Sequence, residues 1–204
     1  MNVTISKGNS KMGSIPSVSL PSVLTCRTDC DCVTKCYARR IERMRKNVRE
    51  SYENNLRLLN EYPDVYWREV EASIMMSRFF RFHVSGDIPD KDYLVHMIGI
   101  AERNQHCEIL CFTKKFGIVN DVISEIKSSG KELPLNLHLI FSGWKNLEMD
   151  NPFCLPEAHV KFKDGTTTAR EDAVDCGGNC TECAITDGGC WSLGTGEQVV
   201  FAEH

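Results

Sequence analysis

The chain has 204 residues and a formal net charge of −4, with acidic and basic residues mixed along its length. This length is enough for one domain with a sizeable core, and the mixed charges exclude a global field that attracts nucleic acid or a membrane surface. No stretch approaches the roughly 20 apolar residues that a membrane span needs. Residues 1–25 contain no unbroken apolar run of the kind found in secretory signals. We therefore expect a cytoplasmic protein whose thiols stay reduced.

The first predicted elements are an extended segment and two helices. Residues 9–25 are rich in Ser, Gly and Pro, which favours an extended chain. Between Cys36 and Leu59, apolar residues recur every three or four positions, as on one face of a long helix. A second helix is predicted over residues 64–77, after the break at Pro63.

The outer face of the predicted long helix is basic. Its cations are Arg39, Arg40, Arg43, Arg45, Lys46 and Arg49. Because glutamates interrupt them and no aromatic residues accompany them, a solvated face is favoured over a nucleic-acid grip.

Strands and helices alternate in the middle of the chain. Strands are predicted over residues 81–85, 108–113 and 136–142, with helices over 91–103 and 119–129 between them. This alternation predicts an α/β fold with a parallel sheet and right-handed crossovers. The chain is too short for a full eight-unit barrel of about 250 residues, so we expect a partial parallel (β/α) barrel.

The predicted domain plan has two parts that pack as one domain. Residues 1–150 form the partial barrel together with an N-terminal cysteine cluster. Residues 151–204 form a cysteine-rich C-terminal extension, with a hairpin over 160–168 around Asp164-Gly165 and a short last strand over 199–201.

The predicted strands have one polar face and polar ends. Arg81, His83 and Ser85 alternate with apolar residues, and His138 and Ser142 do so in the third strand. Ligands in parallel α/β folds bind at the carboxyl ends of the strands. A pocket above the sheet is therefore predicted, and its candidate cofactor-binding residues are His83, Ser85, Gly86, Asp87, Lys114 and Ser142. Core histidines, helix caps and turns are the structural alternative for the same residues.

Two groups of four cysteines are the strongest functional signal. The first group is Cys26, Cys30, Cys32 and Cys36, and the second is Cys176, Cys180, Cys183 and Cys190. Clustered thiols in a reducing compartment hold metal more often than they form disulfides, so each group is a candidate metal centre. Of the other three cysteines, Cys107 and Cys111 are predicted core residues, and Cys154 is undecided.

The spacing of the cysteines bears on which metal they bind. Four thiolates suit tetrahedral zinc or an iron–sulfur cluster. Structural zinc sites usually use Cys-x2-Cys knuckles, and the first group contains none. The second group contains one, at Cys180 and Cys183, so zinc stays open there. The pairs Gly177-Gly178 and Gly188-Gly189 would let backbone N–H groups approach sulfur, or they are simple turns.

Several motifs resemble a phage family called gene product eighty-eight. They are Asn9-Ser10-Lys11, Ser19-Leu20-Pro21, Cys26 with Cys32-x3-Cys36-Tyr37-Ala38, Arg81-x-His83-x-Ser85-Gly86-Asp87, Tyr93, Phe112-Thr113-Lys114, and Cys180-x2-Cys183 with Cys190-Trp191. The resemblance covers nearly the whole chain and implies a phage or prophage origin.

More distantly, the cysteine motif and the short βα units resemble a minimal radical S-adenosylmethionine fold. That resemblance implies a [4Fe-4S] cluster on Cys26, Cys32 and Cys36, and a cofactor loop at Ser85-Gly86-Asp87. The spacing departs from Cys-x3-Cys-x2-Cys, and Cys30 is additional. The second thiol group resembles the site of an auxiliary cluster.

The sequence therefore predicts an iron–sulfur protein with two cysteine-ligated centres and, as its leading enzymatic interpretation, a radical S-adenosylmethionine-like enzyme of unknown substrate. A zinc-stapled binding module without catalysis and an electron-transfer protein are the alternatives. An electron donor is an expected partner, whereas membrane is excluded and nucleic acid is disfavoured.

Overall fold

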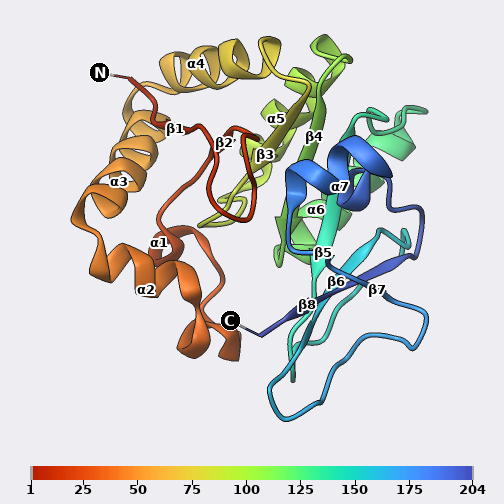
Figure 1. The fold of residues 1–204 in the computed structure, drawn as a ribbon. Coiled ribbons are helices and arrows are strands. Elements are labelled where there is room, and N and C mark those ends of the chain that lie inside the picture. The colour runs from red at the N-terminus through yellow and green to blue at the C-terminus, as the bar shows by residue number, and fades with distance from the viewer. Residues whose placement is uncertain (1, 204) are drawn as a thin grey trace.

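The computed structural model describes residues 2–203, whose eight strands form one open, mostly parallel sheet (Figure 1). The order across the sheet is β1-β2-β3-β4-β5-β6-β8-β7. The strands are β1 (Ile5–Ser6), β2 (Ser17–Val18), β3 (Phe79–Phe82), β4 (Glu108–Thr113), β5 (Leu137–Ser142), β6 (Glu157–Lys161), β7 (Val174–Asp175) and β8 (Gln198–Ala202). Of the described strand pairs, β1 and β2 alone run antiparallel.

Seven α-helices and two short 3₁₀ helices connect these strands in the described part of the chain. They are α1 (Ser22–Thr25), η1 (Asp31–Lys35), α2 (Tyr37–Met44), α3 (Lys46–Glu61), α4 (Pro63–Met75), α5 (Lys91–Arg103), α6 (Phe116–Ser128), α7 (Cys180–Thr186) and η2 (Gly189–Trp191). None of the helices within residues 2–203 combines the length and apolar character that a bilayer crossing requires.

The central β3-α5-β4-α6-β5 units confirm the predicted α/β alternation. Helix α5 and strand β4 have the predicted bounds, because strong local signals coincide there. The Asp90 carboxylate caps α5 by accepting a hydrogen bond from the backbone N–H of Tyr93 at 2.9 Å. Neighbouring β4 and β5 pair in parallel, with Ile109 opposite Leu137.

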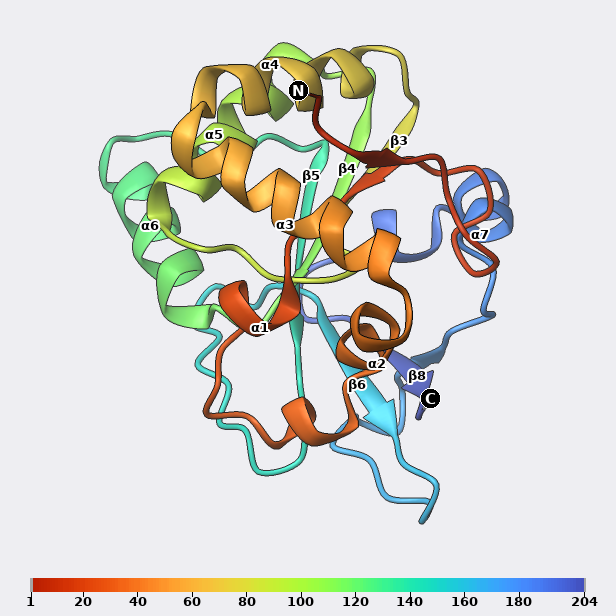
Figure 2. The same cartoon turned by 90° about the vertical axis from the view of Figure 1, so that its left-hand side faces the viewer.

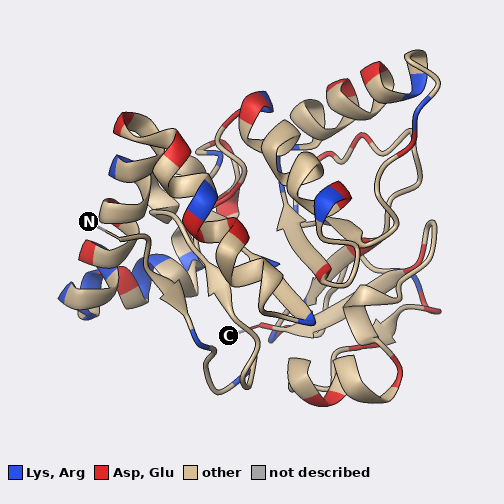
Figure 3. Ribbon diagram, turned by 90° about the horizontal axis from the view of Figure 1, so that it is seen from above, with Lys and Arg blue, Asp and Glu red and all other residues tan. Residues whose placement is uncertain are grey.

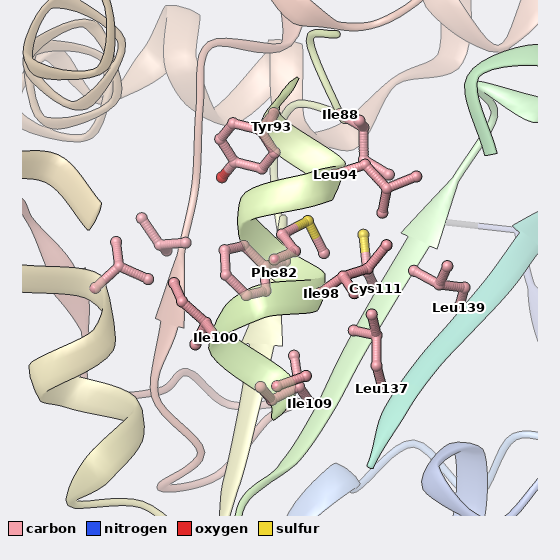
Figure 4. Packing of buried hydrophobic residues seen from close by; sticks show 14 of the residues in the cluster. Phe82, Ile88, Tyr93, Leu94, Ile98, Ile100, Ile109, Cys111, Leu137 and Leu139 are labelled. Atoms are coloured by element: carbon pink, nitrogen blue, oxygen red, sulfur yellow. The ribbon is translucent and has the colours of Figure 1, made fainter. Parts of the chain in front are cut away.

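The two faces of the sheet carry separate cores. On one face, Phe82, Cys111 and Leu139 pack with the helices α3–α6, and Figure 4 shows side chains from α5, β4 and β5 meeting there. On the other face, Leu110 and Ile140 pack with the C-terminal segment that carries α7 and η2. Figure 2 shows the resulting layers, with α7 across the sheet from α5 and α6. Burial of Cys107 and Cys111 in the first core confirms their predicted place.

The single long helix predicted between Cys36 and Leu59 was wrong. The chain leaves the helical conformation at Arg45 (φ −121°, ψ 97°), so α2 and α3 are separate helices. The apolar residues of the sequence keep their helical spacing through this break, so the pattern alone does not reveal it; Met44, just before the break, is exposed. The predicted second helix is present as α4 (Pro63–Met75), which begins one residue earlier than predicted, with Pro63 in its first turn.

The first predicted strand ends earlier than expected, which changes the direction of His83. Strand β3 stops at Phe82, and His83 has a left-handed backbone with φ of 63°. This turn breaks the alternation, so His83 lies against Tyr93 in the helix-covered core, whereas Arg81 lies on the opposite face beside Phe112. The prediction that His83 and Arg81 share one face was therefore wrong.

The hairpin predicted around Asp164-Gly165 was also wrong. A tight turn does form there, since the backbone N–H of Phe162 donates to the carbonyl of Thr166 at 2.8 Å. Among the described residues no antiparallel return strand pairs with β6 after this turn, because β6 already has parallel partners on both sides, β5 and β8. The predicted last strand is present as β8.

Candidate metal centres

The first thiol group lies on the loop that crosses the carboxyl edge of the sheet. Cys26 follows α1, Cys30 caps η1, Cys32 lies within η1, and Cys36 joins η1 to α2. The backbone N–H of Cys32 donates to the sulfur of Cys30 at 3.4 Å. The short helices α1, η1 and α2 thus carry or flank the four cysteines of this segment.

The thiols of the first group perturb one another. Burial raises the pKa of Cys26 to about 12, with further increases from Asp87 and Cys36 and decreases from Lys114 and Lys115. The pKa of Cys32 is also raised to about 12, first by burial and then by the hydrogen bond with Cys30. A thiol that is protonated at neutral pH becomes a thiolate when a metal ion binds it, so these groups need a metal ion to ionise together.

Asp87 ties this loop to the ends of two strands. Its carboxylate accepts hydrogen bonds from the hydroxyl of Thr113 at 2.6 Å and from the backbone N–H of Lys114 at 2.9 Å. Its own backbone N–H donates to the hydroxyl of Thr25, the residue before Cys26, at 3.0 Å. Burial raises the pKa of Asp87. Asp87 therefore joins the segment before Cys26 to the end of β4, through its backbone N–H on one side and its carboxylate on the other.

Ser85 and Gly86 also help to hold the loop that carries the first thiol group. The Ser85 hydroxyl donates to the buried carboxylate of Glu42 at 2.6 Å, which connects the end of β3 to α2. Gly86 has φ of +87°, and a Cβ there would lie 2.7 Å from the carbonyl oxygen of Leu20 and 2.8 Å from the hydroxyl of Thr25. Only glycine fits this close approach without displacing the backbone.

Lys114 and Ser142 form the open part of the strand edge. The Lys114 ammonium donates to the Ser142 hydroxyl at 2.6 Å, and both residues are half-buried. Within residues 2–203 this ammonium forms no ion pair. A cation that forms no described ion pair, although its charge reaches Asp87, thus lies beside Cys26 and Cys32, whose pKa values it lowers.

The second thiol group surrounds one small pocket on the other face of the sheet. Cys176 follows β7, Cys180 and Cys183 lie one helical turn apart on α7, and Cys190 lies in η2. All four cysteines line the pocket, together with Arg81, Leu110, Phe112, Asn179, Trp191 and Phe201. Residues from the middle of the sheet therefore meet the C-terminal thiols.

A close helix contact brings the second group together. Gly189 has φ of +49°, and a Cβ there would lie 2.6 Å from the Cβ of Cys183 and 3.6 Å from its sulfur. Glycine thus lets η2 approach α7. The N-terminal segment closes the other side, because the backbone N–H of Cys180 donates to the carbonyl of Lys11 at 2.8 Å and the Thr181 hydroxyl to that of Met12 at 2.8 Å.

Two buried donors at this pocket have no acceptor. The Nε of Arg81 and the Nε1 of Trp191 are buried and make no hydrogen bond in the described structure. The Arg81 guanidinium lies 4.8 Å from the centre of the Phe112 ring and forms no ion pair with any described carboxylate. A buried donor without a partner costs about 1–3 kcal/mol, so these groups suit an acceptor-rich, negatively charged ligand in the pocket.

The thiols of the second group also perturb one another. Burial raises the pKa of Cys190 to about 12, and Cys176, Cys180 and Cys183 raise it further, whereas Arg81 lowers it. Burial likewise raises the pKa of Cys180, and the charge of Arg81 opposes this. The four sulfurs therefore lie within electrostatic reach of one another and of one cation.

Neither group stands in the geometry of a completed metal site. Within residues 2–203, no three Cys, His, Asp or Glu side chains are placed as ligands of one ion, and none of the eleven cysteines is in a disulfide. Protonated thiols do not attract one another, so ligation requires the thiols to move together and lose their protons. The donor set, the burial and the nearby cations fit a metal–thiolate centre in both groups.

A family model described as Gene product 88 matches residues 2–184 of the chain. The chain belongs to the Gene product 88 family. This match confirms the resemblance on which the family was expected, and it includes the whole first thiol group and the first three cysteines of the second. No curated protein and no solved structure matches the chain.

His83 is a buried histidine without a hydrogen-bond partner in this Gene product 88 protein. Both of its ring nitrogens are buried and make no hydrogen bond among the described residues, and the ring centre lies 5.4 Å from that of Tyr93. Burial lowers the pKa of His83 from 6.5 to about 3. The ring therefore stays neutral in the folded protein, and it contacts the core rather than the open strand edge.

The low pKa of His83 predicts a pH dependence of folding stability. Between pH 6.5 and about 3 the unfolded chain binds a proton that the folded chain does not, so this histidine lowers stability as the pH falls through that window. From pH 7 to pH 5 the loss is about 2 kcal/mol. Urea unfolding of wild type and His83→Asn at both pH values measures it, because asparagine tolerates the left-handed backbone. Equal pH dependence in the two proteins would contradict this assignment.

Sequence reasoning missed three residues of the candidate centres. The strand pattern marks Arg81 as a polar strand residue, but its contact with the second thiol group needs the sheet to lie beneath α7. The one local sign of a special role for Arg81 was its charge between two apolar neighbours, Phe80 and Phe82. Glu42 and Thr25 gave no signal, because their roles come from long-range hydrogen bonds to Ser85 and Asp87.

Proposed function

We propose that this protein is a cytoplasmic iron–sulfur protein with two cysteine-ligated centres. Cys176, Cys180, Cys183 and Cys190 would ligate the second centre. Cys26, Cys32 and Cys36 would ligate the first, with Cys30 as a fourth ligand or a spare thiol. The observation that carries the proposal is the pocket where four thiols meet two buried N–H groups, the Nε of Arg81 and the Nε1 of Trp191, that make no hydrogen bond in the described structure.

Charge supports this proposal at both centres. Thiolate ligands leave a cubane cluster with a net negative charge, which a low-dielectric site must balance. Each thiol group has a cation that forms no described ion pair, Lys114 at the first and Arg81 at the second. Bridging sulfides and thiolates are also hydrogen-bond acceptors, and N–H groups around a cluster tune its potential.

Iron–sulfur clusters are favoured over zinc on the spacing of the ligands and on the donors. The first group lacks the Cys-x2-Cys knuckle of structural zinc sites. At the second group, Arg81 and Trp191 supply buried N–H donors. An iron–sulfur cluster has sulfide acceptors on several faces, so it could accept hydrogen bonds from both. A zinc ion would add no acceptor of its own, so the four thiolates would be the only acceptors for these donors.

The test is anaerobic purification followed by iron, sulfide and zinc analysis and visible absorption. The proposal expects iron and acid-labile sulfide in near-equal amounts, and a broad absorption band that dithionite bleaches. A colourless protein with stoichiometric zinc and no sulfide would support a zinc-stapled binding module instead.

The charge of Arg81 predicts a lower reduction potential for the second centre in Arg81→Met. Reduction adds negative charge, and the nearby guanidinium stabilises it, so its loss should lower the midpoint potential by on the order of 60 mV, a tenfold change in equilibrium constant. Potentiometric EPR titration measures this. Arg78→Met is the matched control, because Arg78 lies on the same chain segment but does not line the pocket. An unchanged potential in Arg81→Met would contradict the role assigned to Arg81.

A radical S-adenosylmethionine-like enzyme, built on a partial (β/α) barrel, is the second candidate. It is favoured by the half-buried Lys114–Ser142 pair beside the first thiol group at the carboxyl edge of the sheet. The side chains of Ser85 and Asp87, in contrast, already form hydrogen bonds within the protein. They therefore support the loop around any ligand. Adding S-adenosylmethionine to the reduced protein tests the candidate. A changed cluster EPR signal or 5′-deoxyadenosine would support it, and no response would leave electron transfer as the function.

A further inference from the structure

The outer face of α2 carries cations that have no described counter-ion. Arg40, Arg43 and Arg45 are exposed and Arg39 is half-exposed. None of these four forms an ion pair with a described residue. The next helix differs, because its cations are paired along α3. These pairs are Lys46–Glu50 at 3.5 Å, Arg49–Glu53 at 3.8 Å and Arg57–Glu61 at 3.3 Å. The unpaired positive charge therefore ends where α3 begins.

The one carboxylate of α2 does not reduce this charge at the surface. Glu42 is buried, and its carboxylate accepts hydrogen bonds from the Ser85 hydroxyl at 2.6 Å and the backbone N–H of Ser22 at 3.2 Å. Met44 is 74% exposed among the arginines. Figure 3 shows both signs of charge mixed over most of the molecule, including the helices nearest the N-terminus, so it is the lack of ion pairs that distinguishes the arginines of α2.

The charged face adjoins the first thiol group. Cys36 is the N-cap residue of α2, so the helix that carries the arginines begins at a proposed cluster ligand. A carrier protein bound on this face would lie close to that cluster. Electron transfer is fastest over short distances, so a surface patch beside a redox centre is where a donor would dock productively.

We propose that the outer face of α2 docks an acidic one-electron carrier protein that reduces the first centre. This inference rests on the proposed iron–sulfur function. One electron passes from the reduced carrier to the oxidised cluster, so the carrier is oxidised and the cluster reduced, and no bond forms or breaks. Arginines around an exposed methionine suit a protein interface, in which Arg and Met are enriched. Charge complementarity speeds the encounter.

Nucleic acid fits this face less well. The α2 helix spans only about 12 Å, so it offers few phosphate contacts, whereas affinity for nucleic acid grows with their number. Tyr37, its one aromatic residue, donates its hydroxyl proton to the Val84 carbonyl and is not available for base stacking. The paired charges of α3 do not extend the patch.

The test is stopped-flow reduction of the oxidised, cluster-loaded full chain by a reduced acidic plant-type ferredoxin. The variant is Arg40→Glu/Arg43→Glu, and its matched control is Arg68→Glu, an exposed arginine on α4. At low salt the double variant should be reduced about tenfold more slowly than wild type, with the difference vanishing at high salt. Arg68→Glu should match wild type. Photoreduced deazaflavin should reduce all three proteins at equal rates.

Each other outcome has a distinct meaning. If the iron and sulfide contents are normal but the double variant is reduced by ferredoxin at the wild-type rate, the docking proposal is overturned and the cluster proposal stands. If the double variant loses binding to a single-stranded 20-mer and keeps its ferredoxin rate, the face binds nucleic acid and the proposal is likewise overturned. A chain without iron and sulfide overturns both proposals.

Discussion

Cys180→Ser/Cys190→Ser should lose about half of the iron and sulfide of the wild-type protein, while the first centre stays loaded. The two residues lie on α7 and η2 and line the same pocket, so their loss leaves two thiols there, too few for a stable cluster. Cys26→Ser/Cys36→Ser should remove the other half in the same way. Iron and sulfide quantitation on anaerobic protein, together with EPR of the reduced state, measures both effects.

Cys154→Ser is the matched control for these cysteine variants. Cys154 is exposed and lies outside both thiol groups, so its substitution should leave iron and sulfide unchanged. Loss of all iron from Cys180→Ser/Cys190→Ser would mean that one centre draws on both ends of the chain. Full retention of iron would exclude the second group as a ligand set. Circular dichroism of each variant distinguishes ligand loss from unfolding.

Gly86→Ala should destabilise the fold by roughly 2–5 kcal/mol, because strain and steric overlap add at this position. Its φ of +87° is unfavourable for any residue with a Cβ, and that Cβ would lie 2.7 Å from the Leu20 carbonyl oxygen and 2.8 Å from the Thr25 hydroxyl. Displacing Thr25 would also disturb the hydrogen bond from Asp87 and hence the position of Cys26. The melting temperature should fall by on the order of 5–15 °C.

Gly130→Ala is the control that separates backbone strain from steric overlap. Gly130 has φ of +73°, but a Cβ there would meet no atom within 4 Å, so this variant carries the backbone strain alone and should lose only about 1 kcal/mol. Thermal unfolding of both variants in the metal-free state measures the difference. A Gly86→Ala protein as stable as Gly130→Ala would show that the loop around Thr25 and Leu20 yields, and that Gly86 does not fix the position of Cys26.

The elements that were predicted correctly are those with strong local signals. For α5 and β4, a helix cap at Asp90, helical periodicity and an apolar strand all agree, and their bounds match the structure. Where one local feature competes with the pattern, prediction failed. The break at Arg45 and the left-handed His83 each change the chain direction, but the pattern of apolar residues in the sequence continues through both and does not reveal them.

The candidate centres could likewise be predicted only in part from the sequence. Cysteine spacing is a one-dimensional signal, so both thiol groups could be recognised as sets of four. Their surroundings could not, because Arg81 meets Cys180 from a strand about a hundred residues earlier in the chain. The same holds for Thr25 and Asp87, which are joined by a hydrogen bond between distant segments.

By itself, the order of residues determined the α/β alternation, the two sets of thiols and the membership of the Gene product 88 family. Those features depend on spacing and composition within short segments, where each residue's preference acts on its neighbours. Tertiary structure decided the open sheet, the cations beside each thiol group and the inward turn of Glu42 that leaves α2 basic. These depend on which distant side chains the packing of two cores brings into contact, and no local interaction specifies that.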